Sequence, residues 1–114
     1  MEKLTMTQFR NYCNKQNGAT YTYDSRNTIS KRNERYNLAP ISCYHIGYYR
    51  NVIVMLNPNV ICFKAGENAL RFDGVEEITI DRESLEVCDV IYITTKWDDS
   101  KHVIMVDRPR KLPF

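Results

Sequence analysis

The sequence predicts an α+β fold in which a short N-terminal helix packs on a curved antiparallel β-meander of about six or seven strands, built as a sheet or a partly open barrel. Three observations support this prediction: a helix-capping pattern near the N-terminus, a series of short segments rich in Ile, Val, Tyr and Phe after Pro40, and turn residues between those segments. The chain has 114 residues, of which 43% are hydrophobic and 26% charged. Because this size and composition suit one hydrophobic core, we expect residues 1–114 to form a single domain.

The helix is expected over residues 6–17. Thr5 and Gln8 have the spacing of a capping box, in which the threonine oxygen accepts from the backbone N–H of Gln8 and the glutamine side chain reaches back. Gly18 supplies a left-handed stop after the last turn. So short a helix is unstable alone, and its apolar stripe therefore has to dock on the sheet. The stripe consists of Met6, Phe9, Tyr12 and Cys13.

Residues 18–40 are predicted to form a polar loop. Asn, Ser, Arg and Lys dominate it, and only Ala19–Tyr23 has the character of a short edge strand. A loop of this length is uncommon inside a compact domain, and such loops are usually functional. We therefore expect this segment to carry the function.

Residues 41–107 are predicted to form the antiparallel sheet, and residues 108–114 form a basic tail. Residues 52–56 and 60–63 are continuously apolar, which predicts central strands covered on both faces. The expected strands cover residues 41–48, 52–56, 60–64, 69–72, 75–81, 87–95 and 102–106.

Short turns connect these strands. Residues 57–59 and 65–68 have hairpin lengths, and Asp73-Gly74 is the strongest turn pattern because a type I′ turn needs positive φ at both central residues. A parallel crossover needs roughly a dozen residues or more, and these links therefore predict antiparallel neighbours.

Charge and tyrosine are unevenly distributed along the chain. Residues 1–51 hold eight basic and three acidic side chains, a net charge of +5, whereas residues 52–107 hold five basic and eleven acidic ones, a net charge of −6. Seven of the eight tyrosines lie in the basic first part. We interpret six of the acidic side chains of the second part as protection of sheet edges. They are Glu76, Glu77, Asp81, Glu83, Glu86 and Asp89.

Tyrosine and arginine side chains interleaved between residues 19 and 50 predict a contact surface. Both residue types anchor protein–protein interfaces, where they bury a large area. The same residue types stack on bases and bind phosphates in single-stranded nucleic acid. The candidate partner-binding residues are Tyr21, Tyr23, Arg26, Lys31, Arg32, Arg35, Tyr36, Tyr48, Tyr49 and Arg50.

This surface has three interpretations. The preferred one is a non-catalytic module that binds a protein partner, such as an inhibitor or accessory protein, including one of phage or mobile-element origin. The alternative is a weak single-stranded nucleic-acid-binding protein, which the pI of about 8.3 disfavours because dedicated binders usually exceed about 9. In the third, several tyrosines, with Tyr12 and Tyr44 among them, simply complete the core. A homodimer through a sheet edge is a further possible partner arrangement.

No motif indicates a catalytic chemistry, a metal site or a cofactor, and we expect none of the three. Cys43 and His45 share a strand face, but residues two apart on a strand project in parallel, and no third residue orients the pair. A metal site would need His102 and Asp99 to converge on that pair, which nothing in their spacing requires.

Composition also predicts the cellular context. The four cysteines have no close C-x-x-C pair, which favours reduced thiols packed in the core. The N-terminus lacks the apolar segment of a secretory signal, and the longest apolar run, Val52–Leu56, is strand-sized. We therefore expect a cytoplasmic protein without a membrane partner.

Overall fold

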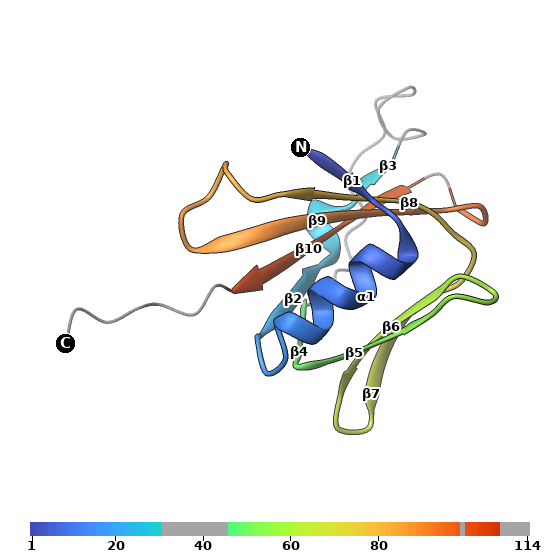
Figure 1. The fold of residues 1–114 in the computed structure, drawn as a ribbon, viewed down its shortest axis with the longest axis horizontal. Helices are drawn as coiled ribbons and strands as arrows, with labels where there is room; N and C mark the ends of the chain where they lie inside the picture. Colours follow the sequence, from blue (N-terminus) through green and yellow to red (C-terminus); the bar gives the residue numbers. More distant parts are fainter. Residues whose placement is uncertain (31–45, 99, 108–114) are drawn as a thin grey trace.

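The computed structural model describes residues 1–30, 46–98 and 100–107, which contain one α-helix and ten strands (Figure 1). The predicted class, one N-terminal helix with antiparallel strands, is confirmed for this part of the chain. In chain order the elements are β1 (Glu2–Leu4), α1 (Met6–Lys15), β2 (Tyr21–Asp24), a 3-10 turn (Ser25–Asn27), β3 (Ile29–Ser30), β4 (Ile46–Tyr49), β5 (Asn51–Met55), β6 (Val60–Ala65), β7 (Asn68–Phe72), β8 (Val75–Asp81), β9 (Cys88–Thr95) and β10 (Ser100–Asp107).

The strands form two antiparallel sheets instead of one continuous meander. The large sheet has the order β1-β8-β9-β10-β2-β4, with β3 also paired to β10. The small sheet has the order β5-β6-β7. Within each sheet the consecutive strands β5-β6-β7 and β8-β9-β10 are meanders, which is the part of the expected topology that the structure shows. The partly open barrel stays a prediction.

Asp73-Gly74 does not close a hairpin, and that prediction is wrong. Gly74 has the expected positive φ of 62°, but β7 and β8 belong to different sheets. The turn instead carries the chain from the small sheet into the large one, where β8 pairs with β1 and β9. The N–H of Val75 donates to the carbonyl of Asn59 at 3.0 Å and ties this crossover to the β5–β6 turn. The predicted β5–β6 and β6–β7 hairpins are confirmed.

Two strands occupy positions opposite to those predicted. β2 was expected at an edge, but it lies between β10 and β4. β5 was expected at a sheet centre, but it is an edge strand of the small sheet, with Ile53 42% and Met55 38% exposed. A continuous apolar run is buried on both faces only where other elements cover both faces of its sheet, and neither that cover nor the strand's place in the sheet can be read from the local sequence.

Asp89, on the central strand β9, does not protect a sheet edge as expected. β1 covers the outer side of β8 at residues 78–80, a stretch that leaves out Glu76 and Glu77. Asp89 is buried at 6% exposure and accepts a hydrogen bond of 2.6 Å from the hydroxyl of Tyr12. The three-residue strand β1 is too short to show a period, which is why sequence patterns did not reveal it.

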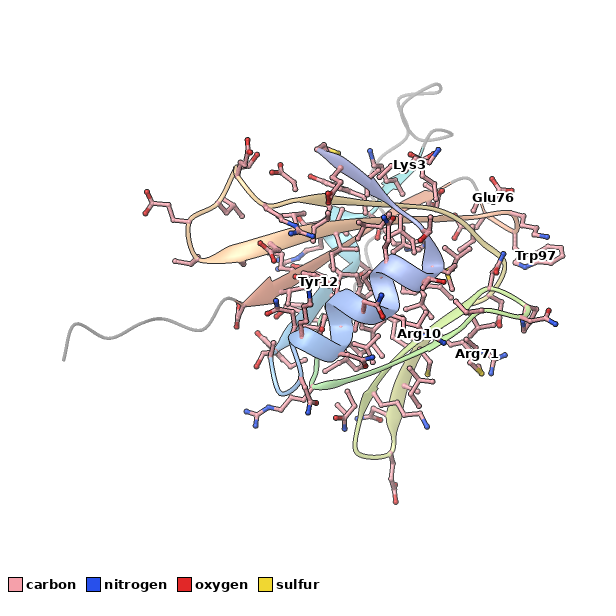
Figure 2. The ribbon with its side chains drawn as sticks, viewed as in Figure 1. Lys3, Arg10, Tyr12, Arg71, Glu76 and Trp97 are labelled. Atoms are coloured by element: carbon pink, nitrogen blue, oxygen red, sulfur yellow. The ribbon has the colours of Figure 1, made fainter. Side chains whose placement is uncertain are left out.

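α1 begins at the predicted capping box. The Gln8 N–H donates to Thr5 Oγ1 at 3.1 Å, and the Thr5 N–H donates to Gln8 Oε1 at 2.8 Å. The helix ends at Lys15, slightly before the predicted residue 17, as the Gln16 N–H is shared between the carbonyls of Tyr12 and Cys13. Tyr12, labelled in Figure 2, projects from the buried face of the helix. No helix in the described ranges is long and apolar enough to cross a membrane.

The core lies between the two sheets and is built from aromatic rings. Phe63 of the small sheet is fully buried, and its ring centroid lies 5.7 Å from that of Tyr21 and 6.3 Å from that of Tyr49, both in the large sheet. Tyr23 and Phe72 form a second pair across the same gap at 6.1 Å. Rings at these distances and angles attract one another beyond the area they bury.

We predict that Phe63→Ala lowers the free energy of unfolding by about 3–5 kcal/mol, because it leaves a cavity where three ring contacts converge. Urea unfolding of the purified variant would measure this loss. Glu67→Ala, at the exposed turn that follows the same strand, should stay within about 0.5 kcal/mol of the original protein. A Phe63→Ala loss as small as that of the control would contradict the proposed core.

Candidate functional site

Three of the predicted contact residues lie in the core. Tyr21, Tyr23 and Tyr49 are only 1%, 8% and 3% exposed. Alternate residues of β2 and β4 face opposite sides of the sheet, and the cross-strand pair Tyr21–Tyr49 falls on the side that faces the small sheet. Their rings hold the two sheets together, and the surface described next does not use them.

The exposed members of the predicted set lie on and beside β4. Tyr48 is 65% exposed, and Ile46, two residues earlier on the same strand face, is 37% exposed. Arg26 and Arg50 are exposed as well. The remaining candidates, Lys31, Arg32, Arg35 and Tyr36, lie outside the described residues.

We define the β4 surface as Ile46 and Tyr48 together with their neighbours on β2 and the turn after it. Tyr48 pairs with Thr22, and Ile46 pairs with Asp24. Arg26 follows Asp24 and completes the surface. An apolar pair is thus bordered by a hydroxyl and a charged pair, the combination of apolar centre and polar rim found in protein interfaces.

Gly47 explains why Ile46 and Tyr48 face outward. The ring of Tyr49 folds back over the inner face of Gly47, where a methyl group would lie 2.6 Å from the ring carbons Cε2 and Cζ. A larger residue at position 47 would displace the ring from the core. The glycine and the buried Tyr49 ring therefore fix the orientation of the strand, and with it the exposed face.

Arg26 is neutralised locally by Asp24. Its Nη2 donates to Asp24 Oδ2 at 2.6 Å, and its Nε donates to Oδ1 at 3.0 Å. The hydrogen bonds from the Arg26 side chain hold the pKa of the Asp24 carboxyl below its ordinary value. The β4 surface is consequently close to neutral, although the sequence segment that contains it is basic.

A second polar cluster joins β10 to β2. Asp98 Oδ2 lies 2.8 Å from His102 Nε2, and His102 Nδ1 lies 3.2 Å from the Tyr23 hydroxyl. A carboxylate only accepts, so Nε2 donates to Asp98, and in the tautomer with its proton on Nε2 the ring accepts at Nδ1 from the Tyr23 hydroxyl. The Tyr23 oxygen can then accept from the Thr28 hydroxyl, 3.2 Å away.

This cluster fastens the start of β10 to β2. Both ring nitrogens of His102 lie within hydrogen-bond distance of a partner, Asp98 on one side and the 8% exposed Tyr23 on the other. No group of three His, Cys, Asp or Glu side chains in residues 1–30, 46–98 and 100–107 could hold a metal ion. The Cys43–His45 pair and Asp99 lie outside the described residues.

Sequence reasoning missed Ile46 and the Asp24–Arg26 pair. The alternation of Ile46 and Tyr48 with Gly47 and Tyr49 was a signal for Ile46, since alternate residues share a face. No protein-family model, curated protein or solved structure matches this chain. The site is therefore interpreted from the chemistry of its own residues.

Asp98 makes the stability of the cluster depend on pH. Partial burial raises the pKa of its carboxyl, but hydrogen bonds from the Ser100 N–H and from His102 outweigh this effect, and the pKa lies below its ordinary value. A carboxyl whose pKa is lower in the folded state stabilises the protein above its unfolded pKa of about 3.9. That contribution is lost as the pH falls through the folded pKa.

We therefore predict that Asp98→Asn lowers the free energy of unfolding at pH 6 and that the difference from the original protein shrinks at about pH 2. The loss at pH 6 should be about 0.5–1 kcal/mol, because the side chain is 42% exposed and solvent screens it. Urea unfolding at both pH values measures the difference, with Glu67→Gln as an exposed control. A difference that is the same at both pH values would contradict the prediction.

Proposed function

We propose that this protein is a non-catalytic module that binds a protein partner through the β4 surface. The observation that carries the proposal is the 65% exposure of Tyr48 beside Ile46, on a strand whose orientation is fixed by the buried ring of Tyr49. An exposed tyrosine on a rigid element offers a large contact area with little loss of rotamer freedom. Tyr48 is therefore the proposed anchor, and Ile46 its apolar neighbour.

The burial of three tyrosines and the pairing of Arg26 favour a protein partner over a nucleic acid. Stacking on single-stranded bases needs exposed rings beside cations that are free to meet phosphates. Tyr21, Tyr23 and Tyr49 are buried, and the Arg26 side chain already donates to both carboxylate oxygens of Asp24. Single-stranded nucleic acid therefore stays the alternative.

The proposed surface extends further along the chain than the described residues. Arg50 lies next to it, and Lys31, Arg32, Arg35 and Tyr36 are added on sequence grounds alone. An inhibitor or accessory role, including one of phage or mobile-element origin, is the biological hypothesis that goes with such a module. The other candidate partner is a second copy of this chain, which could pair with the exposed edge strand β5.

We predict that Tyr48→Ala weakens binding of the protein partner by about thirtyfold, the effect of losing a hot-spot side chain worth about 2 kcal/mol. A photo-crosslinking residue placed at position 46 would first identify the partner in nuclease-treated host extract. Affinity is then measured with the purified pair. Val87→Ala, a 52% exposed residue of the β8–β9 loop, serves as the control and should bind like the original protein.

Three results would count against the proposal. Equal affinities for Tyr48→Ala and Val87→Ala would remove Tyr48 as an anchor. Crosslinks that disappear with nuclease, together with a steep logarithmic salt dependence of oligonucleotide binding, would favour the nucleic-acid alternative. Crosslinks only between copies of this chain would identify a homodimer.

A further inference from the structure

A polar pocket of about 220 Å³ opens between the end of α1 and the junction of β4 and β5. Its lining from the helix side consists of Cys13, Asn14 and Asn17. Its lining from the sheet side includes Arg50, Asn51 and Tyr21. The pocket thus combines a guanidinium group, three amide side chains and a phenol, and none of the residues that line it is acidic.

The hydroxyl of Tyr21 is a buried donor whose one partner is weak. Its oxygen is the one buried side-chain polar atom in the described residues without a hydrogen bond of ordinary geometry. The Cys13 thiol interacts with it as a side-chain hydrogen-bond partner, which contributes to the pKa shifts of both groups. A thiol is a weak donor and acceptor, and a buried hydroxyl held only by a thiol can still donate to a stronger acceptor. The contact with Cys13 places the hydroxyl end of the ring beside the helix side of the pocket.

Both buried groups stay protonated at neutral pH. Burial raises the pKa of the Cys13 thiol to about 12 and moves the pKa of the Tyr21 hydroxyl well above its ordinary value. Neither group therefore brings a negative charge to the pocket, and the Tyr21 hydroxyl is available to donate.

Arg50 gives the pocket its charge. It forms no ion pair with any residue that the structure describes. The pocket also lies at the C-terminal end of α1, and such a helix end carries about half a negative charge. The full positive charge of the Arg50 guanidinium exceeds it. An arginine fork matches the two oxygens of a carboxylate, and asparagine amides can donate to the same oxygens.

We propose that this pocket binds a carboxylate group, held by Arg50 and the neighbouring amides, with the Tyr21 hydroxyl as a buried donor. The volume of about 220 Å³ is below that of drug-sized sites, which suits one small acid or the end of a chain. Two sources share this chemistry: a free small carboxylate and the C-terminal carboxylate of a peptide. The site is additional to the β4 surface and does not depend on Tyr48.

The test is a nuclear magnetic resonance titration of the full chain at constant ionic strength, with sodium acetate replacing sodium chloride. The side-chain amide signals of Asn14, Asn17 and Asn51 should shift and saturate in the millimolar range. N-acetyl-trialanine and its C-terminal amide form the second arm. Tighter binding of the free acid than of acetate identifies a peptide C-terminus as the source, whereas equal or weaker binding identifies a small acid.

Two variants separate a ligand role from a structural one. Arg50→Gln should weaken acetate binding by about tenfold or more, because a charge-assisted bidentate contact is lost. Tyr21→Phe should weaken it by roughly threefold to tenfold while the urea midpoint stays nearly equal, because the hydroxyl loses only the weak contact with the Cys13 thiol. Arg71→Gln, which removes the same charge from the small sheet, is the matched control and should bind like the original protein.

The proposal is overturned if no amide signal saturates below about 100 mM acetate, or if Arg50→Gln binds as tightly as Arg71→Gln. It is also overturned if Tyr21→Phe loses stability while its acetate affinity is unchanged, since the contact of the hydroxyl with the Cys13 thiol would then be its only role. Partner binding by Tyr48→Ala is measured separately, so each proposal can fail alone.

Discussion

The contact of Phe63 with Tyr21 and Tyr49 is the interaction on which the rest of the structure depends. These rings join two sheets that share no strand pairing, and Tyr49 lies at the end of β4, just before the chain passes into the small sheet. Burial of three large aromatic residues supplies much of the apolar area that a small core needs. It also decides which side of β2 and β4 faces solvent.

The site follows from this constraint. Once the Tyr49 ring lies over Gly47, strand alternation places Ile46 and Tyr48 on the outer face. The same packing draws the Tyr21 hydroxyl into the interior next to the helix, where its one partner is the Cys13 thiol. The proposed anchor and the proposed pocket are thus two consequences of one packing arrangement.

Local sequence patterns predicted the elements better than their assembly. The capping box at Thr5 and Gln8 placed the start of α1, and the strand segments from residue 52 onward match β5 to β10 to within a residue or two. The assignment of strands to sheets could not be predicted, since Asp73-Gly74 favours the same tight turn in a hairpin and in a crossover. Sheet membership depends on contacts between residues far apart in sequence.

The site was predicted only in part for a related reason. Composition identified a segment rich in tyrosine and arginine, but composition does not distinguish a ring that packs inward from one that faces solvent. Polar Thr22 and Asp24 alternate with Tyr21 and Tyr23, and this pattern already indicates that the two tyrosines point inward. The neutralisation of Arg26 by Asp24 required the geometry of the turn.

The most direct measurement is chemical nitration of the folded protein, followed by mass spectrometry of each tyrosine. If the aromatic core divides the tyrosines as described, Tyr48 reacts before Tyr21, Tyr23 and Tyr49, which stay protected until urea unfolds the chain. Nitration of these three at the rate of Tyr48 under folding conditions would contradict the division between core and contact surface.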